Sequence, residues 1–385
     1  MTTAGKHSAV EERLRSWPDP LELGVFVLAP LMWTTWILTY AALNGSLALD
    51  FQKELWPGAR SILSGQDPYP PAIAEILATG ANFVFPAAAG LLMAPFALLP
   101  PFAANVLYTI LLSAVAFLIL RLLGVRDWRV YGAVFLWTPM HQAIQSGNLT
   151  LLLALGAALA WRWRNRPWLA GCAVAIAVSL KLLLWPLLFW LIATRRFRAA
   201  IVAAALTGVV TVGSWSVLGL GFDGMRHYVE VLRVLSGVFG EESYTPFAFL
   251  VELGVAPWIA HAVGYSIAVL ALGATLTARS DLSRFALAIA AALLFSPIVW
   301  MHYPVLLIVP LAVWRPTLSP LWFVPLVAWF CPANGNGAAW QTALVLAMMA
   351  TLVAAIVAGS RRSATRSFPR RHVLAPVLAR TDRPS

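Results

Sequence analysis

Apolar stretches recur along almost the whole sequence, and they restrict its fold more than any other feature. Windows of 17–23 mostly apolar residues follow one another from about residue 22 to residue 359. Each window is long enough to cross a hydrocarbon core of about 30 Å as an α-helix. A transmembrane β-barrel needs strands of about ten residues with alternating polarity, and the segment 101–123 shows no such alternation. The pattern therefore predicts an all-α polytopic membrane protein.

The composition excludes a soluble enzyme. Hydrophobic residues make up 60% of the 385 residues and charged residues only 11%, against about 45–50% and about 25% in soluble domains. The run at 22–43 is a full-length span that follows a segment of mixed charge. We therefore expect a retained first helix rather than a cleavable signal peptide. The two cysteines lie in or beside apolar segments, which argues against a disulfide framework and against a metal site.

The basic residues indicate how the chain crosses the membrane. The formal net charge is +11, and only three of the 27 basic residues are lysines. Most arginines form short clusters at helix ends, as in cytoplasmic loops, so the charge encodes topology and does not indicate a nucleic-acid partner. It also favours contact with anionic membrane lipid. We assign 22 basic residues to the cytoplasm and four to the opposite side. The cytoplasmic segments are 1–21, 121–129, 162–166, 195–198, 279–284, residue 315 and 361–385.

With both termini in the cytoplasm, the sequence divides into about 12 transmembrane helices. They form one transmembrane domain, 22–360, between the N-terminal segment 1–21 and an arginine-rich tail, 361–385, which we expect to be disordered. The proline-containing stretch 83–99 has to be re-entrant or lie against the outer face, because a full crossing there would place the arginines of 162–166 outside. The predicted spans are 22–43, 101–123, 130–145, 148–161, 167–181, 182–194, 199–219, 258–277, 284–300, 303–314, 320–332 and 340–359.

Two predicted outer loops, at about 44–82 and 220–257, are much longer than a connection requires. Loops of this length often carry function. In the first loop, apolar residues recur at helical spacing opposite charged ones, which predicts short amphipathic helices that lie in the membrane interface. The apolar residues are Phe51, Leu55, Ala59 and Ile62, and the charged ones are Lys53, Glu54 and Arg60.

Several functional classes lose support because their residues are missing. No acid lies deep inside a predicted span, and Asp127 is the only carboxylate between residues 83 and 222. Ion-coupled transporters usually hold a carboxylate near the bilayer midplane, so its absence weakens a transporter interpretation. The sequence also lacks the nucleotide-binding and zinc-binding motifs that ATP-driven and zinc chemistry use.

Three of the remaining polar residues lie at the outer membrane boundary. Asp50 directly follows the first span. Taken alone it is a solvated loop carboxylate, but partial desolvation at the interface would raise its pKa, as a general base requires. His302 ends another span and, taken alone, is an interfacial histidine beside the aromatic belt. His141 lies near the outer end of its span and could join them.

Lys181 and Asn148 extend this polar set. Lys181 is the only lysine after residue 53, and it lies in leucine-rich sequence. A lysine in the membrane that does not reach the inner surface needs an anionic partner. Asn148 ends the segment Gln-Ser-Gly-Asn at 145–148, which predicts a tight outer turn between two short spans.

Seven motifs, taken in order, resemble a known family. The sequence is similar to the polyprenol-phosphate-sugar-dependent glycosyltransferases of family 87, in the membrane-embedded GT-C superfamily, over about residues 22–360. No single motif is specific, and the resemblance depends on their order and spacing. The motifs are Asp-Phe at 50–51, Gly-Gln-Asp-Pro-Tyr at 65–69, Phe-Val-Phe-Pro…Pro-Phe-Ala-Leu-Leu-Pro at 83–100, Gly-Asn-Leu at 147–149, Pro-Trp-Leu-Ala-Gly…Leu-Lys at 167–181, Arg-Arg-Phe-Arg at 195–198 and Ser-Pro-Ile-Val-Trp-Met-His at 296–302.

The resemblance implies a GT-C type bundle with interfacial helices in the first outer loop. It also implies a catalytic aspartate matching Asp50, a site histidine matching His302, and polar contacts to the donor phosphate. Three positions depart from the family pattern. Its usual Gly-Gln-x-Asn is Gln-Ser-Gly-Asn here, so only Asn148 matches. Lys181 is followed by leucine where proline or threonine is common, and Tyr303 stands where a second histidine is common.

The chemistry of such a donor fits the polar residues. A monophosphate leaving group needs cationic or hydrogen-bonding contacts as charge builds on its oxygens, which suits Lys181, His302 and Asn148. One carboxylate, Asp50, suffices as the base for a single displacement with inversion. A second, nucleophilic carboxylate nearby would indicate retention, but we interpret Glu54 as a surface acid. Further candidate contacts to the donor phosphate or substrate are His141, Tyr303 and Arg60.

These features predict an inverting glycosyltransferase that moves mannose from polyprenyl-phosphate mannose to a lipid-anchored glycan. The alternatives are an arabinofuranosyltransferase with the corresponding polyprenyl donor and, with less support, a lipid-linked-sugar transporter. A transporter would spread polar residues through the full membrane depth. The expected location is a bacterial plasma membrane with the site on its outer face. The expected partners are the donor lipid, a glycolipid or lipoglycan acceptor and membrane lipid, and we expect neither a cofactor nor a metal.

Overall fold

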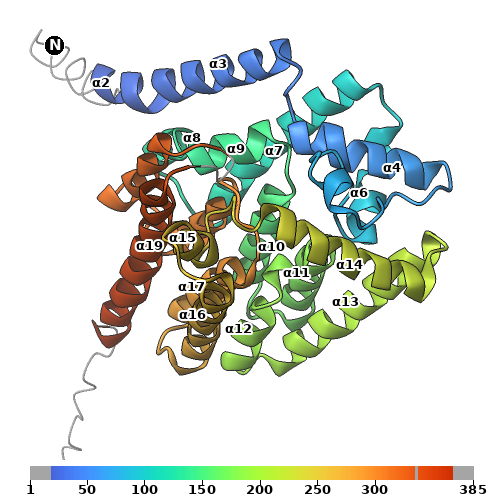
Figure 1. Ribbon diagram of the computed structural model, residues 1–385. Helices are drawn as coiled ribbons and strands as arrows, with labels where there is room; N and C mark the ends of the chain where they lie inside the picture. The colour runs from blue at the N-terminus through green and yellow to red at the C-terminus, as the bar shows by residue number, and fades with distance from the viewer. Residues whose placement is uncertain (1–18, 334–336, 367–385) are drawn as a thin grey trace, which may run out of the picture.

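The computed structural model describes residues 19–333 and 337–366, and every regular element in this part of the chain is helical. The prediction of an all-α fold is thus confirmed for the described residues. Figure 1 shows the helices packed into one bundle, with the first helix lying across one end of it. Most of the predicted N-terminal segment and residues 367–385 of the predicted tail lie outside the described residues.

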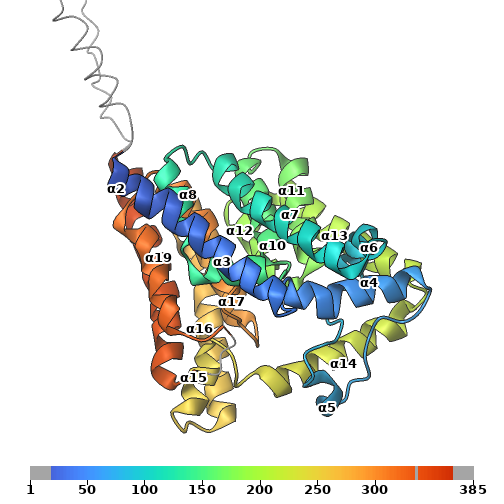
Figure 2. The same ribbon diagram turned by 90° about the horizontal axis from the view of Figure 1, so that it is seen from above.

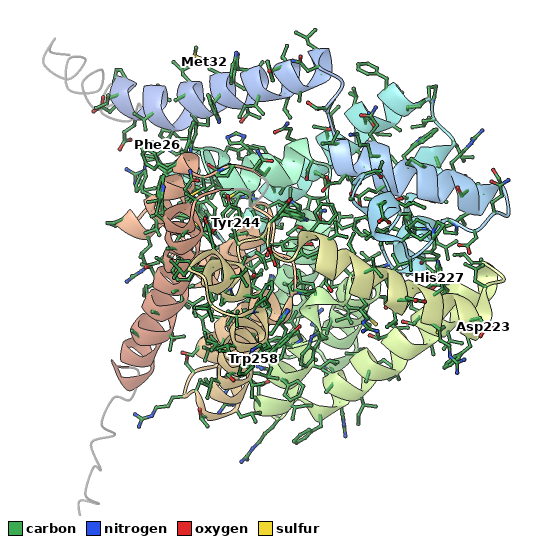
Figure 3. The ribbon with its side chains drawn as sticks, viewed as in Figure 1. Phe26, Met32, Asp223, His227, Tyr244 and Trp258 are labelled. Carbon is green, nitrogen blue, oxygen red and sulfur yellow. The ribbon has the colours of Figure 1, made fainter. Side chains whose placement is uncertain are left out.

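Within the described ranges, five helices are long and apolar enough to cross a membrane. They are the continuous helix Pro20–Leu43 (α2, η1 and α3), α7 (Pro101–Leu122), α13 (Phe197–Val217), α16 (Pro257–Thr277) and α19 (Ala339–Arg366). A sixth crossing results if α9 (Thr138–Gln145) and α10 (Thr150–Arg162), which meet at 114°, count as one broken span. Apolar side chains on these helices face outward, as lipid-facing residues do. Met32 and Trp258, for example, are 70% and 74% exposed (Figure 3).

The other predicted spans form shorter helices, so the predicted count of about 12 is not confirmed. The longest of them, α17, has 15 residues and is about 22 Å long, shorter than a hydrocarbon core of about 30 Å. Proline interrupts several of these segments, since it removes a backbone hydrogen bond. The elements are α8 (Trp128–Phe135), α11 (Pro167–Leu180), η3 (Leu182–Leu184), α12 (Leu187–Ala193), α17 (Asp281–Phe295), η4 (Tyr303–Leu307), α18 (Ile308–Trp314) and η5 (Pro320–Phe330).

The two predicted outer loops are mostly helical and pack against each other. The first contains η2 (Phe51–Leu55), α4 (Trp56–Leu63) and α5 (Ala74–Leu77), and the second contains α14 (Gly221–Phe239) and α15 (Pro246–Glu252). Figure 2 shows α5 beside α14. The ring nitrogen Nε2 of His227 on α14 lies 2.8 Å from the carbonyl oxygen of Pro70. The ring of Tyr69 lies beside that of Tyr228 on α14, with centroids 5.4 Å apart.

The proline-containing stretch 83–99 forms α6 (Ala87–Ala97), which has 11 residues and a length of about 16 Å. It is therefore too short to cross the bilayer by itself. It packs on α4, where the guanidinium of Arg60 donates a 3.1 Å hydrogen bond to the carbonyl of Ala97.

Four of the arginine-rich segments that we predicted to be cytoplasmic, 121–129, 162–166, 195–198 and 279–284, gather at one end of the helices. Asp281 forms ion pairs with Arg164 at 3.5 Å and with Arg196 at 2.7 Å, which joins three of the segments. Asp127 pairs with Arg129 and also accepts a 2.9 Å hydrogen bond from the backbone N–H of Leu318. This bond joins the segment 121–129 to the segment that follows α18. Helices α7 and α10 both end at these clusters.

Candidate active site

Asp50 is held where the first outer loop meets the turn between α9 and α10. Its backbone N–H donates a 2.7 Å hydrogen bond to the carbonyl of Ser146, and the N–H of Phe51 donates to the same oxygen at 3.3 Å. Gly147 has a φ of +67°, and a Cβ there would lie 2.9 Å from the Cβ atoms of Ala48 and Phe51. Only glycine fits this position without strain, so the tight turn predicted from sequence docks directly on the segment that carries Asp50.

The side chain of Asn148 contacts the carboxylate of Asp50. Its Nδ2 donates a 2.9 Å hydrogen bond to Oδ2 of Asp50. Its Oδ1 accepts hydrogen bonds from the backbone N–H and the hydroxyl of Thr150, at 3.2 and 2.8 Å. Because Thr150 occupies the oxygen of this buried amide, the amide nitrogen has to face Asp50. Asn148 therefore orients the carboxylate, whereas the sequence had suggested a contact to the donor phosphate.

The electrostatic setting of Asp50 suits a base. Burial raises the pKa of Asp50 above its ordinary value of 3.8, while the hydrogen bond from Asn148 and the charge of Lys181 act in the opposite direction. A carboxylate with a raised pKa is a stronger proton acceptor than one in water, and it is still ionised near neutral pH when cationic and hydrogen-bonding neighbours support its charge.

Lys181 ends α11 in an extended conformation that turns its side chain toward the site. Its Nζ donates a hydrogen bond to the hydroxyl of Tyr303 and lies 4.4 Å from the centroid of that ring and 5.4 Å from the ring of Phe85. None of the ion pairs in the described part of the chain includes Lys181. The ammonium is therefore placed by aromatic rings and a phenol, and its charge is available to an anionic ligand.

His302 lies beside Tyr303 in the segment that joins α17 to η4. The two rings meet edge to face, with centroids 4.7 Å apart. Both residues are buried, and Nε2 of His302 has no hydrogen-bond partner among the described residues. The second outer loop supports this segment, because the N–H of Tyr244 donates a 2.9 Å hydrogen bond to the carbonyl of Val299. A buried, unpaired ring nitrogen is costly, and a ligand contact would satisfy it.

Glu54 is closer to the site than the sequence suggested. It follows Asp50 by one helical turn and is half-buried, so the interpretation as a surface acid was wrong. Burial, and then the charge of Asp50, raise the pKa of Glu54 well above 4.5. A negative charge on Asp50 disfavours a second one on Glu54, so Glu54 holds its proton more tightly than an ordinary glutamate does. The spacing of four residues between Asp50 and Glu54 was the feature of the sequence that could have predicted this proximity.

Tyr108 is a further polar group near the site that the sequence analysis missed. It lies on α7 and stacks on Phe51 at 4.4 Å, and its hydroxyl is buried without a hydrogen-bond partner in the described structure. A single tyrosine within a long apolar span gives no signal of its own, because tyrosine is common in such spans.

Two predicted residues are not brought to the carboxylate. The ring of His141 meets the edge of Trp33 at 6.1 Å, and Arg60 is exposed and bonds the end of α6. Neither makes a described contact with Asp50, Lys181 or His302. Among the residues that the structure describes, no group of three or more histidine, cysteine or acidic side chains is arranged to hold a metal ion.

Comparison with known proteins identifies related sequences. The sequence model of glycosyltransferase family 87 matches residues 83–298, more than half of the chain. The polyprenol-phosphate-mannose-dependent alpha-(1-2)-phosphatidylinositol pentamannoside mannosyltransferase of Mycolicibacterium smegmatis is 26% identical over 321 residues, which cover 77% of this chain and 74% of that protein. These matches confirm the resemblance found in the sequence.

Two arabinofuranosyltransferases match shorter regions. The alpha-(1->3)-arabinofuranosyltransferase of Mycolicibacterium smegmatis is 28% identical over 166 residues, 39% of this chain and 38% of its own. That of Mycobacterium tuberculosis is 26% identical over 233 residues, 56% and 52% of the two chains. The matched region thus spans about two fifths of the length of the first relative and about half of the length of the second. No solved structure matches it.

Proposed function

Because the chain belongs to glycosyltransferase family 87, we propose that it transfers mannose, with inversion, from polyprenyl-phosphate mannose to a lipid-anchored glycan. The mannosyltransferase relative supports this donor, since it aligns over 77% of the chain. The acceptor is a glycolipid or lipoglycan whose sugar hydroxyl reaches the membrane surface.

The proposed reaction is a single displacement at the anomeric carbon. Asp50 accepts the proton of the acceptor hydroxyl as the oxygen forms its bond to that carbon. The bond between the carbon and the phosphate oxygen breaks, and its electron pair leaves with the phosphate. Lys181 and His302 contact the phosphate as its charge increases, and Tyr303 holds the ammonium of Lys181 in place. Asn148 keeps the Asp50 carboxylate aimed at the acceptor.

One observation carries this proposal: a carboxylate oriented by Asn148 shares its site with a lysine that forms no ion pair with any described residue. Such a pair can accept a proton and bind an anionic leaving group. The test is transfer of radiolabelled sugar into membrane glycolipid by the purified protein. We expect transfer from polyprenyl-phosphate mannose. Transfer from neither this donor nor the arabinose donor would contradict the proposal.

Arabinofuranosyl transfer is the second candidate, because two of the relatives carry that activity in their names. The same site chemistry serves both donors, since each leaves a polyprenyl monophosphate. The two are distinguished by offering both donors at equal concentration and identifying the transferred sugar.

We further propose that the site faces the outer side of a bacterial plasma membrane and that both termini are cytoplasmic. The gathering of arginines at the opposite end of the helices supports this orientation. We also propose that the short helices complete a bundle of about 12 crossings of the GT-C type, with η2 and α4 in the outer interface.

A further inference from the structure

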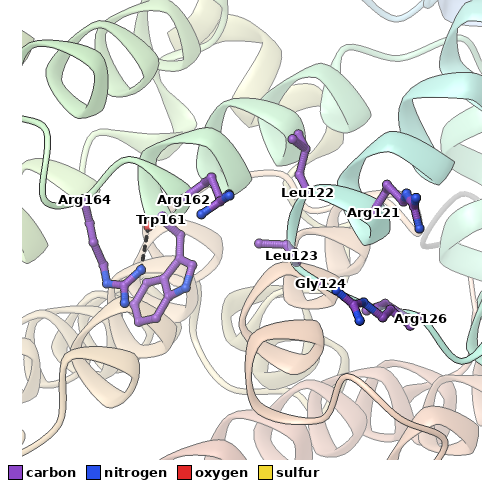
Figure 4. Close-up of a pocket in the computed structure, with 9 residues that line it drawn as sticks. Arg121, Leu122, Leu123, Gly124, Arg126, Trp161, Arg162 and Arg164 are labelled. Carbon is purple, nitrogen blue, oxygen red and sulfur yellow. Dashed lines mark hydrogen bonds between the residues drawn. The ribbon is translucent and has the colours of Figure 1, made fainter.

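A basic pocket lies at the ends of α7 and α10, away from the proposed active site. It has a volume of about 550 Å³, and its lining includes four arginines and no acidic residue (Figure 4). The arginines are Arg121, Arg126, Arg162 and Arg164. Helix α10 begins beside Asn148 and ends at Arg162, so its 13 residues separate the pocket from Asp50 by about 20 Å.

The positive charge of the pocket is only partly neutralised within the protein. Arg164 pairs with Asp281 at 3.5 Å and lies 4.4 Å from the ring centroid of Trp161. No ion pair in the described part of the chain includes Arg121, Arg126 or Arg162. Outside the pocket, Arg129 and Arg196 pair with carboxylates, whereas Arg195, Arg198 and Arg315 form no ion pair with the described residues.

The helix ends account for part of this charge but not for all of it. Arg121 and Arg162 lie in the last turns of α7 and α10, where each helix dipole contributes about half a negative charge. These two ends offset about one of the four positive charges, and Asp281, which is shared with Arg196, offsets part of a second, so roughly two or more remain. A positive excess attracts a phosphate group, which arginine binds through paired N–H donors.

The surroundings of the pocket favour a lipid phosphate over a soluble one. Phe117 and Leu118, one turn before Arg121 on α7, are 49% and 45% exposed. They extend an apolar surface from the pocket along a helix long enough to cross the membrane. A headgroup in the pocket would thus leave its acyl chains against α7.

We propose that this pocket binds the phosphate of an anionic phospholipid headgroup in the leaflet opposite the active site. Basic pockets at the cytoplasmic ends of transmembrane helices recognise such headgroups. The site is separate from the donor site and adds a second lipid ligand to the protein.

The test measures lipid binding to the full-length protein in detergent by native mass spectrometry, with phosphatidylglycerol, phosphatidylcholine and inorganic phosphate as probes. The pocket variant is Arg121→Gln/Arg126→Gln/Arg162→Gln. The control is Arg195→Gln/Arg198→Gln/Arg315→Gln, which removes the same charge from exposed arginines at the same end of the helices. The thermal midpoint of each variant shows whether it is folded.

We expect phosphatidylglycerol to bind the wild type and the control more tightly than phosphatidylcholine does. The pocket variant should lose about a hundredfold in affinity, since each arginine near an anionic surface contributes about fivefold. An equal loss of lipid affinity in both variants would mean that binding depends on general surface charge and not on the pocket, and it would overturn the proposal. Unchanged binding in a folded pocket variant would also overturn it, as would displacement of the lipid by millimolar inorganic phosphate.

Discussion

At the scale of single residues, the proposed base is defined by its neighbours more than by its own position. Asp50 in a solvated loop would be an ordinary carboxylate. Here Asn148 donates to it, Thr150 fixes the direction of that amide, and Lys181 supplies a nearby positive charge. The sequence predicted seven site residues, and the structure brings neither His141 nor Arg60 to Asp50. The seven are Asp50, His302, Lys181, Asn148, His141, Tyr303 and Arg60. The sequence did not predict that Asn148 would face Asp50, because that contact joins residues 98 positions apart.

The hydrogen bond from Asn148 gives a pH-dependent prediction. It lowers the pKa of Asp50, so the variant Asn148→Ala should have a higher pKa at this carboxylate. The base must be ionised, and activity is lost as the pH falls through its pKa. The acidic limb of kcat/KM against pH should therefore move to higher pH in Asn148→Ala. The exposed Asn165→Ala is the control, and an unmoved limb in Asn148→Ala would mean that the amide does not act on the base.

Glu54 allows a test of the single-displacement mechanism. Burial and the charge of Asp50 raise the pKa of Glu54 and so favour its protonated form, which Glu54→Gln imitates with a neutral amide of the same shape. We expect a loss in kcat of less than about tenfold and a product with inverted anomeric configuration, because a general acid or base contributes about 10²–10⁴ and Glu54 is neither. A larger loss, together with retained configuration in the product of the wild type, would instead identify Glu54 as a nucleophile.

At the scale of elements, long apolar runs were predictable and short ones were not. The spans at 22–43, 101–123 and 258–277 correspond closely to helices of the structure. Segments such as 182–194 and 320–332 were apolar enough to be assigned as spans. Pro186 divides the first, and several prolines favour a 3₁₀ helix in the second. An apolar composition indicates that a segment is surrounded by lipid or by protein interior. It does not distinguish a helix that crosses the membrane from a short helix inside the bundle.

The turn at Gly147 is the element that connects the first loop to the bundle. Gly147→Ala would force an alanine into positive φ and place its Cβ against Ala48 and Phe51. We expect a lower thermal midpoint and a loss of activity, because the turn carries both Ser146 and Asn148 to Asp50. The matched control is Gly208→Ala on α13, where a Cβ has open space and the helix gains stability. Equal behaviour of the two variants would contradict this role for the turn.

At the scale of the whole molecule, the arginine clusters and the charged residues of the proposed site lie at opposite ends of the helices. The paired arginines lie at one end of the helices, and the carboxylate and lysine of the proposed site lie at the other. The arginine clusters were predictable from sequence because they are local. The site was predictable in part, because its residues follow the ends of apolar runs, whereas the tilt and packing that bring them together depend on contacts between distant segments.

This separation predicts the accessibility of the two ends. Cysteines are introduced at Ser64 and at Asn165, one at a time, in a protein whose Cys172 and Cys331 are replaced by serine. In intact cells, a thiol reagent that does not cross membranes should label Ser64→Cys and should label Asn165→Cys only after permeabilisation. The reverse pattern would place the active site in the cytoplasm.

The central claim is that Asp50 is the base of a sugar transfer, and Asp50→Asn tests it most directly. The change keeps the shape of the side chain and removes the proton acceptor. Transfer of radiolabelled sugar from the polyprenyl-phosphate donor should fall by about 10²–10⁴, while the thermal midpoint and donor binding stay close to those of the wild type. Normal transfer by a folded Asp50→Asn protein would contradict the account, and the site would then have to be rebuilt around His302.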